Sequence, residues 1–295
     1  MASKEIKLSC RNVWKVYGKS PDDFFNKNNG NVSDPLKLAQ EMNHKEHIVA
    51  NANVSFDVHV GEIFVIMGLS GSGKSTTARV ITGLLPQLAG EIKFDGQILP
   101  KRLEDRTKEQ KRIIQMIYQM ADTAMNPRQT VREIIGRPLE FYLNLKGREK
   151  EKRILELLDM IELDDQFIDR LPSELSGGQK QRICIARALA ANPKFIICDE
   201  VTSALDQIVQ EGILKLLMRL QKELNLTYLF ITHDISTVRA ISDEVVVMNL
   251  GEVVEQGLKA DVFSPPHPDY TELLLSSVPE MDPDWLKNLN ERRNS

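Results

Sequence analysis

The chain has 295 residues, of which 42% are hydrophobic and 27% are charged, and its formal net charge is −4. This length and apolar content are enough for a substantial core, and the charged fraction argues against bulk disorder. A slightly negative chain has no global basic field, so we expect no nucleic-acid partner. The sequence also contains no apolar run near the ~18–20 residues of a membrane helix.

The termini and cysteines favour a soluble protein of a reducing compartment. The first ten residues lack the apolar stretch of a signal peptide. The three cysteines (Cys10, Cys184 and Cys198) lie far apart and form no C-x-x-C pair. This spacing argues against a disulfide framework, a zinc ribbon or a multi-cysteine iron–sulfur site.

The N-terminal part predicts two strand regions separated by an insertion. Residues 5–17 are β-prone and predict a first strand. Residues 18–47 are polar and Asn-rich and are typical of an inserted loop, in which Asp34 and Pro35 predict the start of a short helix. Alternation then returns in NVSFDVHV, which is followed by the apolar run IFVIM at 63–67. We expect these two segments to form a β-hairpin whose second arm is buried.

The remaining pattern alternates between strands and helices. A helical spacing follows the glycines after residue 67 and ends at Pro86, and GEIKFDGQIL predicts an antiparallel hairpin. Further strands are expected at 111–118, 195–199, 227–232 and 244–250, and helices within 130–162, at 179–191, at 207–224 and, briefly, after 232. This order predicts an α/β core with a mainly parallel sheet, antiparallel hairpins and a helical insert.

The strongest motif directly follows the apolar run IFVIM. Gly68-Leu-Ser-Gly-Ser-Gly73-Lys74-Ser75 fits the phosphate-loop pattern G-x-x-x-x-G-K-[ST]. The glycines let successive backbone N–H groups face one anion, and the helix that begins there adds its positive end. The lysine reaches the β- and γ-phosphates, and the Ser75 hydroxyl ligates Mg²⁺. An ordinary Gly/Ser turn is the alternative, but a strand before and a helix after the loop argue against it. The predicted nucleotide-binding residues are Gly68, Ser70, Gly71, Ser72, Gly73, Lys74, Ser75 and Thr76.

A second acidic motif ends a buried strand. The segment FIICDE places Asp199 at the carboxyl end of that strand, where α/β folds bind ligands. We expect Asp199 to hold Mg²⁺ through a water, and Glu200 to orient or deprotonate the attacking water. An Asp-Glu turn without function is the alternative, and the phosphate loop argues against it.

The pentapeptide LSGGQ at 175–179 precedes an Ala-rich helix. Ser176 together with the backbone of Gly177 and Gly178 would form a second phosphate-binding surface at a helix start. The chain would then have two phosphate-binding helix starts but only one acidic Mg²⁺ site. This suggests that each nucleotide site is shared between two molecules. The residues alone equally allow Ser176 to be only an N-cap.

Three further residues stand at predicted strand ends. Gln119 follows the strand at 111–118, and His233 follows TYLFIT at the sheet end that carries the phosphate loop. Tyr17 closes the first strand, where an aromatic ring could stack on a base. Each of these residues, taken alone, is more often structural.

Together these motifs resemble the nucleotide-binding subunit of an ABC transporter over roughly 5–17 and 48–278. Their order matches the family: Tyr17, GLSGSGKS, Gln119, LSGGQ, IICDE, the SALD segment that ends at Asp206, and His233. The resemblance implies the following roles. Tyr17 stacks on adenine, Lys74 binds phosphate, Ser75, Gln119 and Asp199 surround Mg²⁺, Glu200 is the catalytic base, and His233 contacts the γ-phosphate. Ser176, Gly177, Gly178 and Gln179 close over the ATP of the other subunit, and Asp206 belongs to the loop that crosses the dimer interface.

The resemblance also implies an architecture. It predicts a P-loop NTPase core with a mainly parallel sheet, an antiparallel β-subdomain and a helical subdomain. The ABC ATPase domain would span 1–278, with the insertion at 18–47 and the helical subdomain at about 120–175, followed by a tail at 279–295. The helical subdomain would face the membrane partner.

The implied cofactors are ATP and Mg²⁺. The implied partners are a second ATPase subunit, identical or paralogous, in a head-to-tail dimer, two membrane-spanning permease subunits, and an extracytoplasmic solute-binding protein. The implied location is peripheral, on the cytoplasmic face of the inner membrane.

The subfamily signals differ between the two ends of the chain. The segment Asn126-Pro127-Arg128 and the tail SPPHPDYTELLLSSVP resemble oligopeptide, dipeptide and nickel importer ATPases, whereas the opening with its insertion resembles glycine-betaine and other quaternary-amine importer ATPases. The cysteine cluster of many peptide-importer ATPases and the regulatory domain of some betaine-importer ATPases are both missing. The more numerous signals favour the peptide group.

Two other classes stay open. A soluble ABC ATPase that acts on ribosomes or DNA usually carries two cassettes or a long coiled coil, and the sequence has neither feature. A nucleotide-binding regulator without turnover is the other class, and the presence of Glu200 and His233 argues against it.

Overall fold

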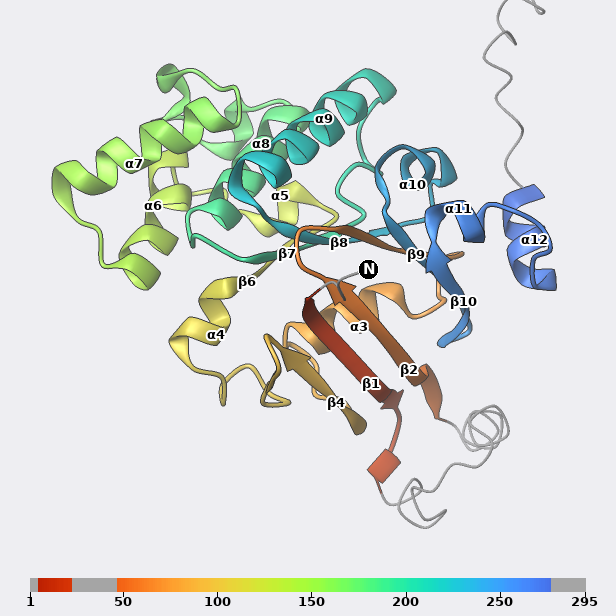
Figure 1. Ribbon diagram of the computed structural model, residues 1–295. Coiled ribbons are helices and arrows are strands. Elements are labelled where there is room, and N and C mark those ends of the chain that lie inside the picture. The colour runs from red at the N-terminus through yellow and green to blue at the C-terminus, as the bar shows by residue number, and fades with distance from the viewer. Residues whose placement is uncertain (1–4, 23–46, 277–295) are drawn as a thin grey trace, which may run out of the picture.

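The computed structural model describes residues 5–22 and 47–276, arranged as two sheets with helices around them (Figure 1). The predicted helix that starts at Asp34 and the predicted tail at 279–295 lie outside the described residues. Within the described part, no helix combines the length and the apolar character needed to cross a bilayer.

The smaller sheet is antiparallel and has the order β2-β1-β4-β5. Its strands are β1 (Ile6–Tyr17), β2 (Ile48–His59), β4 (Ala89–Phe94) and β5 (Gln97–Ile98). β1 is an inner strand, because it pairs with β2 on one side and β4 on the other. The predicted first strand and the predicted hairpin of β4 and β5 are confirmed.

The larger sheet has the order β10-β9-β3-β8-β7-β6, and all its pairs are parallel except β9 with β10. Its strands are β3 (Ile63–Met67), β6 (Ile114–Ile117), β7 (Phe195–Asp199), β8 (Thr227–Thr232), β9 (Glu244–Asn249) and β10 (Glu252–Leu258). Every residue of β3, β7 and β8 is buried, as expected for central strands of a sheet covered on both faces.

The helices divide between the two faces of the parallel sheet. The element α3 (Lys74–Ile81) packs in the layer toward the antiparallel sheet. The opposite face is covered by helices that Figure 1 shows above the sheet: α5 (Ala121–Ala124), α6 (Val131–Leu143), α7 (Gly147–Met160), α8 (Gly177–Leu189), α9 (Gln207–Leu224) and α10 (Ile235–Ile241). The remaining short elements are α4 (Lys108–Ile113), η1 (Asp165–Phe167), η2 (Pro172–Glu174), α11 (Lys259–Val262) and α12 (Asp269–Ser276).

Side-chain alternation along β3 builds a core on each face of the sheet. Val65 and Met67 join the apolar cluster on the side of the large helices, whereas Phe64 and Ile66 join the cluster shared with α3 and the antiparallel sheet. Because successive residues of a strand point to opposite faces, one short apolar run supplies both layers. The architecture confirms the predicted α/β class with its mainly parallel sheet, antiparallel sheet and helical part.

The predicted hairpin of residues 48–59 with 63–67 is wrong. β2 pairs with β1, and β3 lies between β8 and β9 in the other sheet. The burial of the two strands explains the difference. β2 alternates between buried and partly exposed residues, which suits a sheet edge, whereas β3 is buried throughout and needs a neighbour on each side.

Two predicted element bounds are also wrong. The segment predicted as one strand at 111–118 is the end of α4 followed by β6, because Thr107 and Gln110 form a capping box that starts a helix at Lys108. The helix after the phosphate loop ends at Ile81 rather than near Pro86. Gly83 there has a φ of +77°, the left-handed conformation that commonly terminates a helix.

Candidate active site

The loop from Gly68 to Ser75 joins β3 to α3, and its glycines are required by the backbone. Gly68 and Gly73 have φ values of +152° and +99°. A Cβ at Gly68 would lie 2.2 Å from the carbonyl oxygen of Met248, and one at Gly73 would lie 2.2 Å from that of Ala50. A side chain at either position would therefore displace neighbouring backbone. The space beside Gly71 is open, with no atom within 4 Å of a Cβ placed there.

The ammonium of Lys74 turns back onto its own loop. Its Nζ donates hydrogen bonds of 2.9 and 2.8 Å to the carbonyl oxygens of Gly68 and Leu69. Burial lowers the pKa of Lys74, while the carboxylates of Glu200 and Asp199 act in the opposite direction. A buried cation that is held mainly by neutral carbonyl groups is a strong attractor for an anion in this loop.

A hydroxyl and a carboxylate meet beside the loop. Oγ of Ser75 donates a hydrogen bond of 2.8 Å to Oδ1 of Asp199, the last residue of β7. Asp199 is 5% exposed, and this burial raises the pKa of its carboxyl, against the hydrogen bond from Ser75 and beside the repelling charge of Glu200. A hydroxyl and a buried carboxylate oxygen are ligand types that suit Mg²⁺.

Glu200 is held in a strained conformation with both carboxylate oxygens engaged. Its φ is +49°, in the left-handed region, and its N–H donates a hydrogen bond of 2.9 Å to the carbonyl of Ile231 on β8. Nε2 of Gln119 donates to Oε2 of Glu200 at 2.9 Å, and Nδ1 of His233 lies 3.4 Å from Oε1. Strain of this kind is maintained where a side chain must be aimed at one place.

These contacts bring together one group of predicted residues. Ser75, Asp199, Glu200, Gln119 and His233 come from α3, the end of β7 and the segments after β6 and β8. They meet because the carboxyl ends of parallel strands share one edge of the sheet. In this arrangement Gln119 donates to Glu200 and to Ser203 at 3.3 Å rather than to the Ser75–Asp199 pair.

The LSGGQ residues lie in a second group, with Asp206. Oγ of Ser176 accepts from the N–H of Gln179 at 3.3 Å, so Ser176 does cap α8. A Cβ at Gly177 would meet Leu205 at 3.5 Å, and Asp206 itself caps α9 by accepting from the N–H of Val209 at 3.0 Å. Capping occupies the side chain of Ser176. Gly177 and Gly178 have no side chain to cover the backbone at the start of α8.

Tyr17 stands apart from both groups at the end of β1. Its side chain is 38% exposed, and the ammonium of Lys15 lies 5.1 Å from the ring centroid. In the pairing of β1 with β2, Lys15 lies opposite Asn51. Tyr17 is therefore two residues along β1 from Lys15, whose partner Asn51 on β2 contacts the phosphate loop at Gly73.

Three supporting residues were not among the predicted site residues. Asn51 is fully buried on β2, and its Nδ2 donates to the carbonyl of Gly73 at 3.3 Å and to Oγ1 of Thr77 at 2.8 Å. The hydroxyl of Tyr270 on α12 accepts from the N–H of Leu69 at 3.2 Å. Ser203 contacts Gln119, as noted above. A lone Asn in an alternating strand and a Tyr near the C-terminus give no local signal, because their partners are distant in sequence.

Comparison with known proteins supports the same reading. The family profile described as ABC transporter matches residues 51–203. The oligopeptide transport ATP-binding protein OppF of Lactococcus lactis subsp. lactis is 40% identical over 237 residues, which cover 80% of this chain and 74% of OppF. The glutathione import ATP-binding protein GsiA of Salmonella paratyphi A is 45% identical over 231 residues, which cover 78% of this chain and 37% of GsiA.

A solved structure agrees as well. The dimeric structure of a post-hydrolysis state of the ATP-binding cassette MJ0796, bound to ADP and Pi, superposes with a TM-score of 0.67 at 32% identity, covering 85% of this chain and 98% of that chain. These matches confirm the predicted resemblance to ATP-binding subunits and the predicted fold. The chain belongs to the ABC transporter family.

Proposed function

We propose that this chain is the ATP-hydrolysing subunit of an ABC importer that takes up short peptides. The observation that carries the proposal is the Glu200 carboxylate, which is fixed between Gln119 and His233 beside the Ser75–Asp199 pair. A site of this construction suits phosphoryl transfer to water. The relatives named for oligopeptide transport and glutathione import support a peptide solute over a quaternary amine.

The loop residues fit the phosphates of ATP. The open space beside Gly71 and the buried ammonium of Lys74 lie on the same loop, at the start of α3. A phosphate would replace the two carbonyl acceptors of Lys74 with a charged one, which makes a stronger hydrogen bond. We propose that residues 68–76 hold the phosphates and that Tyr17 stacks on the adenine ring.

The Ser75–Asp199 pair fits Mg²⁺. When bound, the ion would neutralise charge on the phosphate oxygens. Ser75, Asp199 and Gln119 would hold it. The protein group that acts on the attacking water is Glu200, which accepts its proton, while His233 donates a hydrogen bond toward the γ-phosphate.

The second group of residues supports a site shared by two subunits. The solved relative is a dimer. Ser176, Gly177, Gly178, Gln179 and Asp206 gather around the starts of α8 and α9, so each subunit would present this surface to the ATP of its partner in a head-to-tail dimer. The partner is either a second copy or a paralogue.

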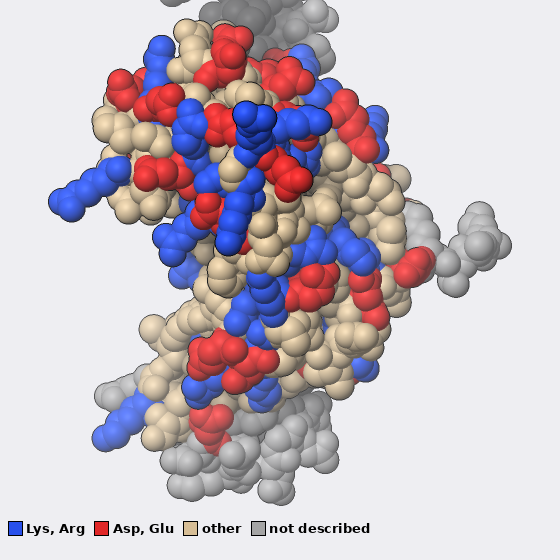
Figure 2. All heavy atoms as spheres, turned by 90° about the vertical axis from the view of Figure 1, so that its left-hand side faces the viewer, with Lys and Arg blue, Asp and Glu red and all other residues tan. Residues whose placement is uncertain are grey.

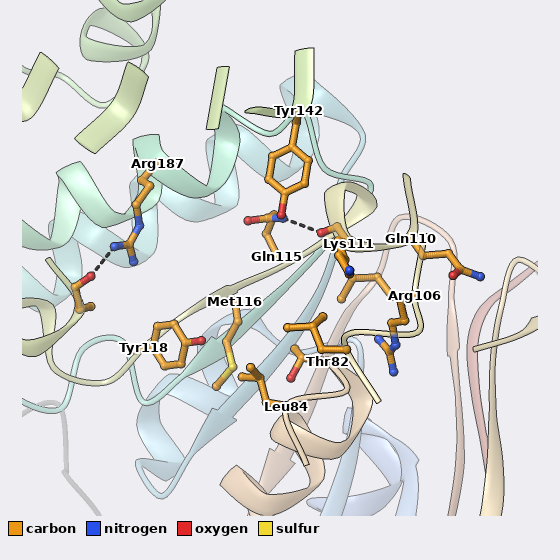
Figure 3. Close-up of a pocket in the computed structure, with 13 residues that line it drawn as sticks. Thr82, Leu84, Arg106, Gln110, Lys111, Gln115, Met116, Tyr118, Tyr142 and Arg187 are labelled. Atoms are coloured by element: carbon orange, nitrogen blue, oxygen red, sulfur yellow. Dashed lines mark hydrogen bonds between the residues drawn. The ribbon is translucent and has the colours of Figure 1, made fainter. Parts of the chain in front are cut away.

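The helical part supports the contact with membrane-spanning subunits. A cavity of about 300 Å³ lies where α4, β6, α6 and α8 meet (Figure 3). Gln115, Tyr142 and Arg187 line it, and Phe141, whose ring packs edge-on against that of Tyr142, is 57% exposed. Figure 2 shows the helical side of the molecule, where acidic and basic side chains are intermixed over the surface. We propose that two permease subunits dock here, so that the chain lies peripherally on the cytoplasmic face of the inner membrane and an extracytoplasmic protein delivers the peptide.

The proposal is tested by co-isolation from native membranes followed by assay. We expect the chain to purify with membrane-spanning subunits and, after reconstitution, to hydrolyse ATP faster when peptide and a solute-binding protein are added. Glu200→Gln in the same complex is the control for hydrolysis at this site. Isolation without membrane-spanning subunits would contradict the transport role, and stimulation by a quaternary amine instead of peptide would contradict the solute class.

A further inference from the structure

A cluster of three side chains lies far from the nucleotide site, where the two sheets meet. His59 is the last residue of β2, Glu62 directly precedes β3, and Glu244 begins β9. The phosphate loop begins at the other end of β3, which at the usual strand rise is about 16 Å away. The cluster therefore has no part in the hydrolysis described above.

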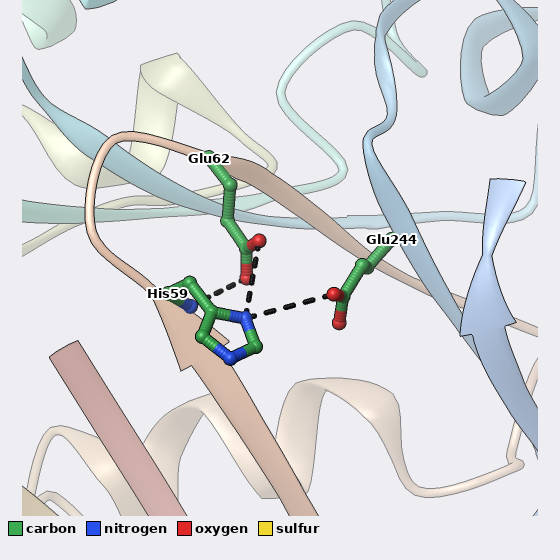
Figure 4. Close-up of side chains that lie close together, drawn as sticks. All are labelled: His59, Glu62 and Glu244. Carbon is green, nitrogen blue, oxygen red and sulfur yellow. Dashed lines mark hydrogen bonds and ion pairs between the residues drawn. The ribbon is translucent and has the colours of Figure 1, made fainter. Parts of the chain in front are cut away.

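The carboxylates of Glu62 and Glu244 both face one atom, Nδ1 of His59 (Figure 4). Oε2 of Glu62 lies 3.4 Å from it, and Oε1 of Glu244 lies 3.6 Å from it. One ligand atom from each residue can be chosen so that all three lie within 4.8 Å of one another. One carboxylate comes from the connection between β2 and β3 and the other from the start of β9, so sequence neighbours alone do not explain the arrangement.

Hydrogen bonding does not account for this geometry. Nδ1 of His59 is buried and makes no hydrogen bond to any described residue. The backbone N–H of His59, by contrast, donates to Oε1 of Glu62 at 2.5 Å, which fixes the carboxylate with its second oxygen toward the ring. A buried imidazole nitrogen that faces two carboxylate oxygens just beyond hydrogen-bond length forms an ion pair with them if the ring is protonated, and offers them a shared metal ligand set if the ring is neutral.

A metal ion explains the separations. Zn²⁺ binds imidazole nitrogen and carboxylate oxygen at roughly 2.0–2.2 Å in tetrahedral geometry, which places neighbouring ligand atoms about 3.4 Å apart. The two nitrogen–oxygen distances in the cluster, 3.4 and 3.6 Å, are close to this value. We propose that His59, Glu62 and Glu244 form a binding site for a divalent transition-metal ion of the Zn²⁺ class, with imidazole and carboxylate as ligands.

The surroundings favour one further ligand from solvent. The side chain of Glu62 is 3% exposed, whereas those of His59 and Glu244 are each 22% exposed. The buried carboxylate would anchor the ion, and the open side would accept a water as the fourth ligand. Because His59 belongs to the antiparallel sheet and Glu244 to the parallel sheet, the bound ion would tie the two sheets together.

The test uses the purified full-length chain without an affinity tag and without nucleotide. Zn²⁺ is titrated by calorimetry, and Co²⁺ is added separately because a tetrahedral site gives it strong visible absorption. We expect one Zn²⁺ per chain, a Co²⁺ spectrum of the tetrahedral type, and a rise in melting temperature on adding Zn²⁺. His59→Gln and Glu244→Gln should each weaken Zn²⁺ binding by at least about tenfold and abolish the spectrum.

The matched control is His267→Gln. Nδ1 of His267 is also buried without a hydrogen-bond partner among the described residues, but His267 is outside the cluster. This variant should bind Zn²⁺ as the original chain does. The proposal is overturned if the original chain takes up no stoichiometric Zn²⁺, or if Glu244→Gln, whose half-buried side chain stands at the first position of β9, retains full affinity and the Co²⁺ spectrum.

Discussion

Ser75 and Asp199 are joined by a hydrogen bond of 2.8 Å, which links the first turn of α3 to the end of β7. The bond holds a buried carboxylate next to the phosphate loop although burial raises the pKa of that carboxylate. The protein therefore keeps a carboxylate here at a cost in stability, as is common for groups that serve function.

The first prediction concerns this cost. An acid whose pKa is raised by folding binds more protons in the folded state than in the unfolded state, so its contribution to stability falls as the pH rises through the interval between the two pKa values. Asp199→Asn removes the charge and keeps an oxygen that accepts from Ser75. We expect this variant, without nucleotide, to melt at a higher temperature than the original chain at pH 7.

In Asp199→Asn, we also expect Mg²⁺ to have no effect on the affinity for ATP. Melting curves at pH 4 and pH 7, with and without Mg²⁺ and ATP, separate the two effects. The advantage of the variant should shrink at the lower pH, because the raised pKa makes protonation of the folded carboxyl more favourable as the pH falls. A variant that melts lower than the original chain at pH 7 would show that Asp199 is stabilising as a carboxylate.

The second prediction concerns Glu200. In Glu200→Gln the amide retains the shape of the side chain but cannot accept the proton of the attacking water. We expect ATP affinity to be retained and kcat to fall by at least about 10²–10⁴-fold, the range for general base catalysis. The measurement is ATP turnover in the complex with the membrane subunits. Turnover within a few-fold of the original would remove Glu200 from its proposed role.

The third prediction concerns Gly177. A Cβ here meets only Leu205 at an ordinary contact distance of 3.5 Å, so a side chain is tolerated by the fold. Gly177→Asp would place a carboxylate beside the ATP phosphates of the other subunit, where like charges repel. We expect unchanged ATP affinity of the monomer but loss of ATP-dependent dimerisation and of turnover.

The matched control is Gly177→Ala, which adds the Cβ without the charge and should retain most activity. Lys74→Ala provides the comparison for a residue that serves its own site. If Gly177→Asp weakens ATP binding to the monomer as strongly as Lys74→Ala does, the shared-site proposal is wrong.

The fourth prediction concerns Asn51. This side chain is fully buried, and its amide supports Gly73 and Thr77. Asn51→Ala removes two buried hydrogen bonds, each worth about 0.5–1.5 kcal/mol, while Gly73 and Thr77 keep their bond to each other, so we expect the free energy of unfolding to fall by about 1–3 kcal/mol. ATP affinity should fall as well, because the loop loses its support.

The control lies on the same strand. Ser55 accepts a hydrogen bond from the N–H of Asn12 at an exposed position, and Ser55→Ala should change stability by less than about 1 kcal/mol and leave ATP affinity unaltered. Urea unfolding and equilibrium ATP binding of both variants provide the comparison. Equal effects in the two variants would contradict a specific role for Asn51.

The predictable part of the structure is local. The phosphate loop and the helix at 207–224 carry complete signals within a few residues, and the structure places α9 at Gln207–Leu224. The partner of a strand is not local, which explains why β2 was predicted to pair with β3. The alternation of β2 and the uninterrupted burial of β3 do distinguish an edge strand from a central one, but only once the rest of the sheet is known.

The site shows the same division. Motif spacing predicts Ser75, Asp199 and Glu200, and the sheet edge brings them together. Motif spacing does not predict that Gln119 contacts Glu200, or that Asn51 and Tyr270 support the phosphate loop. These contacts join residues far apart in the chain and depend on how the two sheets and the C-terminal helix pack.

The central claim is that two subunits share each ATP, and the molecular mass of Glu200→Gln in solution tests it most directly. Sedimentation of this variant with ATP and Mg²⁺ should show a dimer, and with ADP a monomer. Adding Gly177→Asp to the same chain should abolish the dimer while ATP remains bound. A Glu200→Gln chain that binds ATP at saturation yet sediments as a monomer would contradict the account.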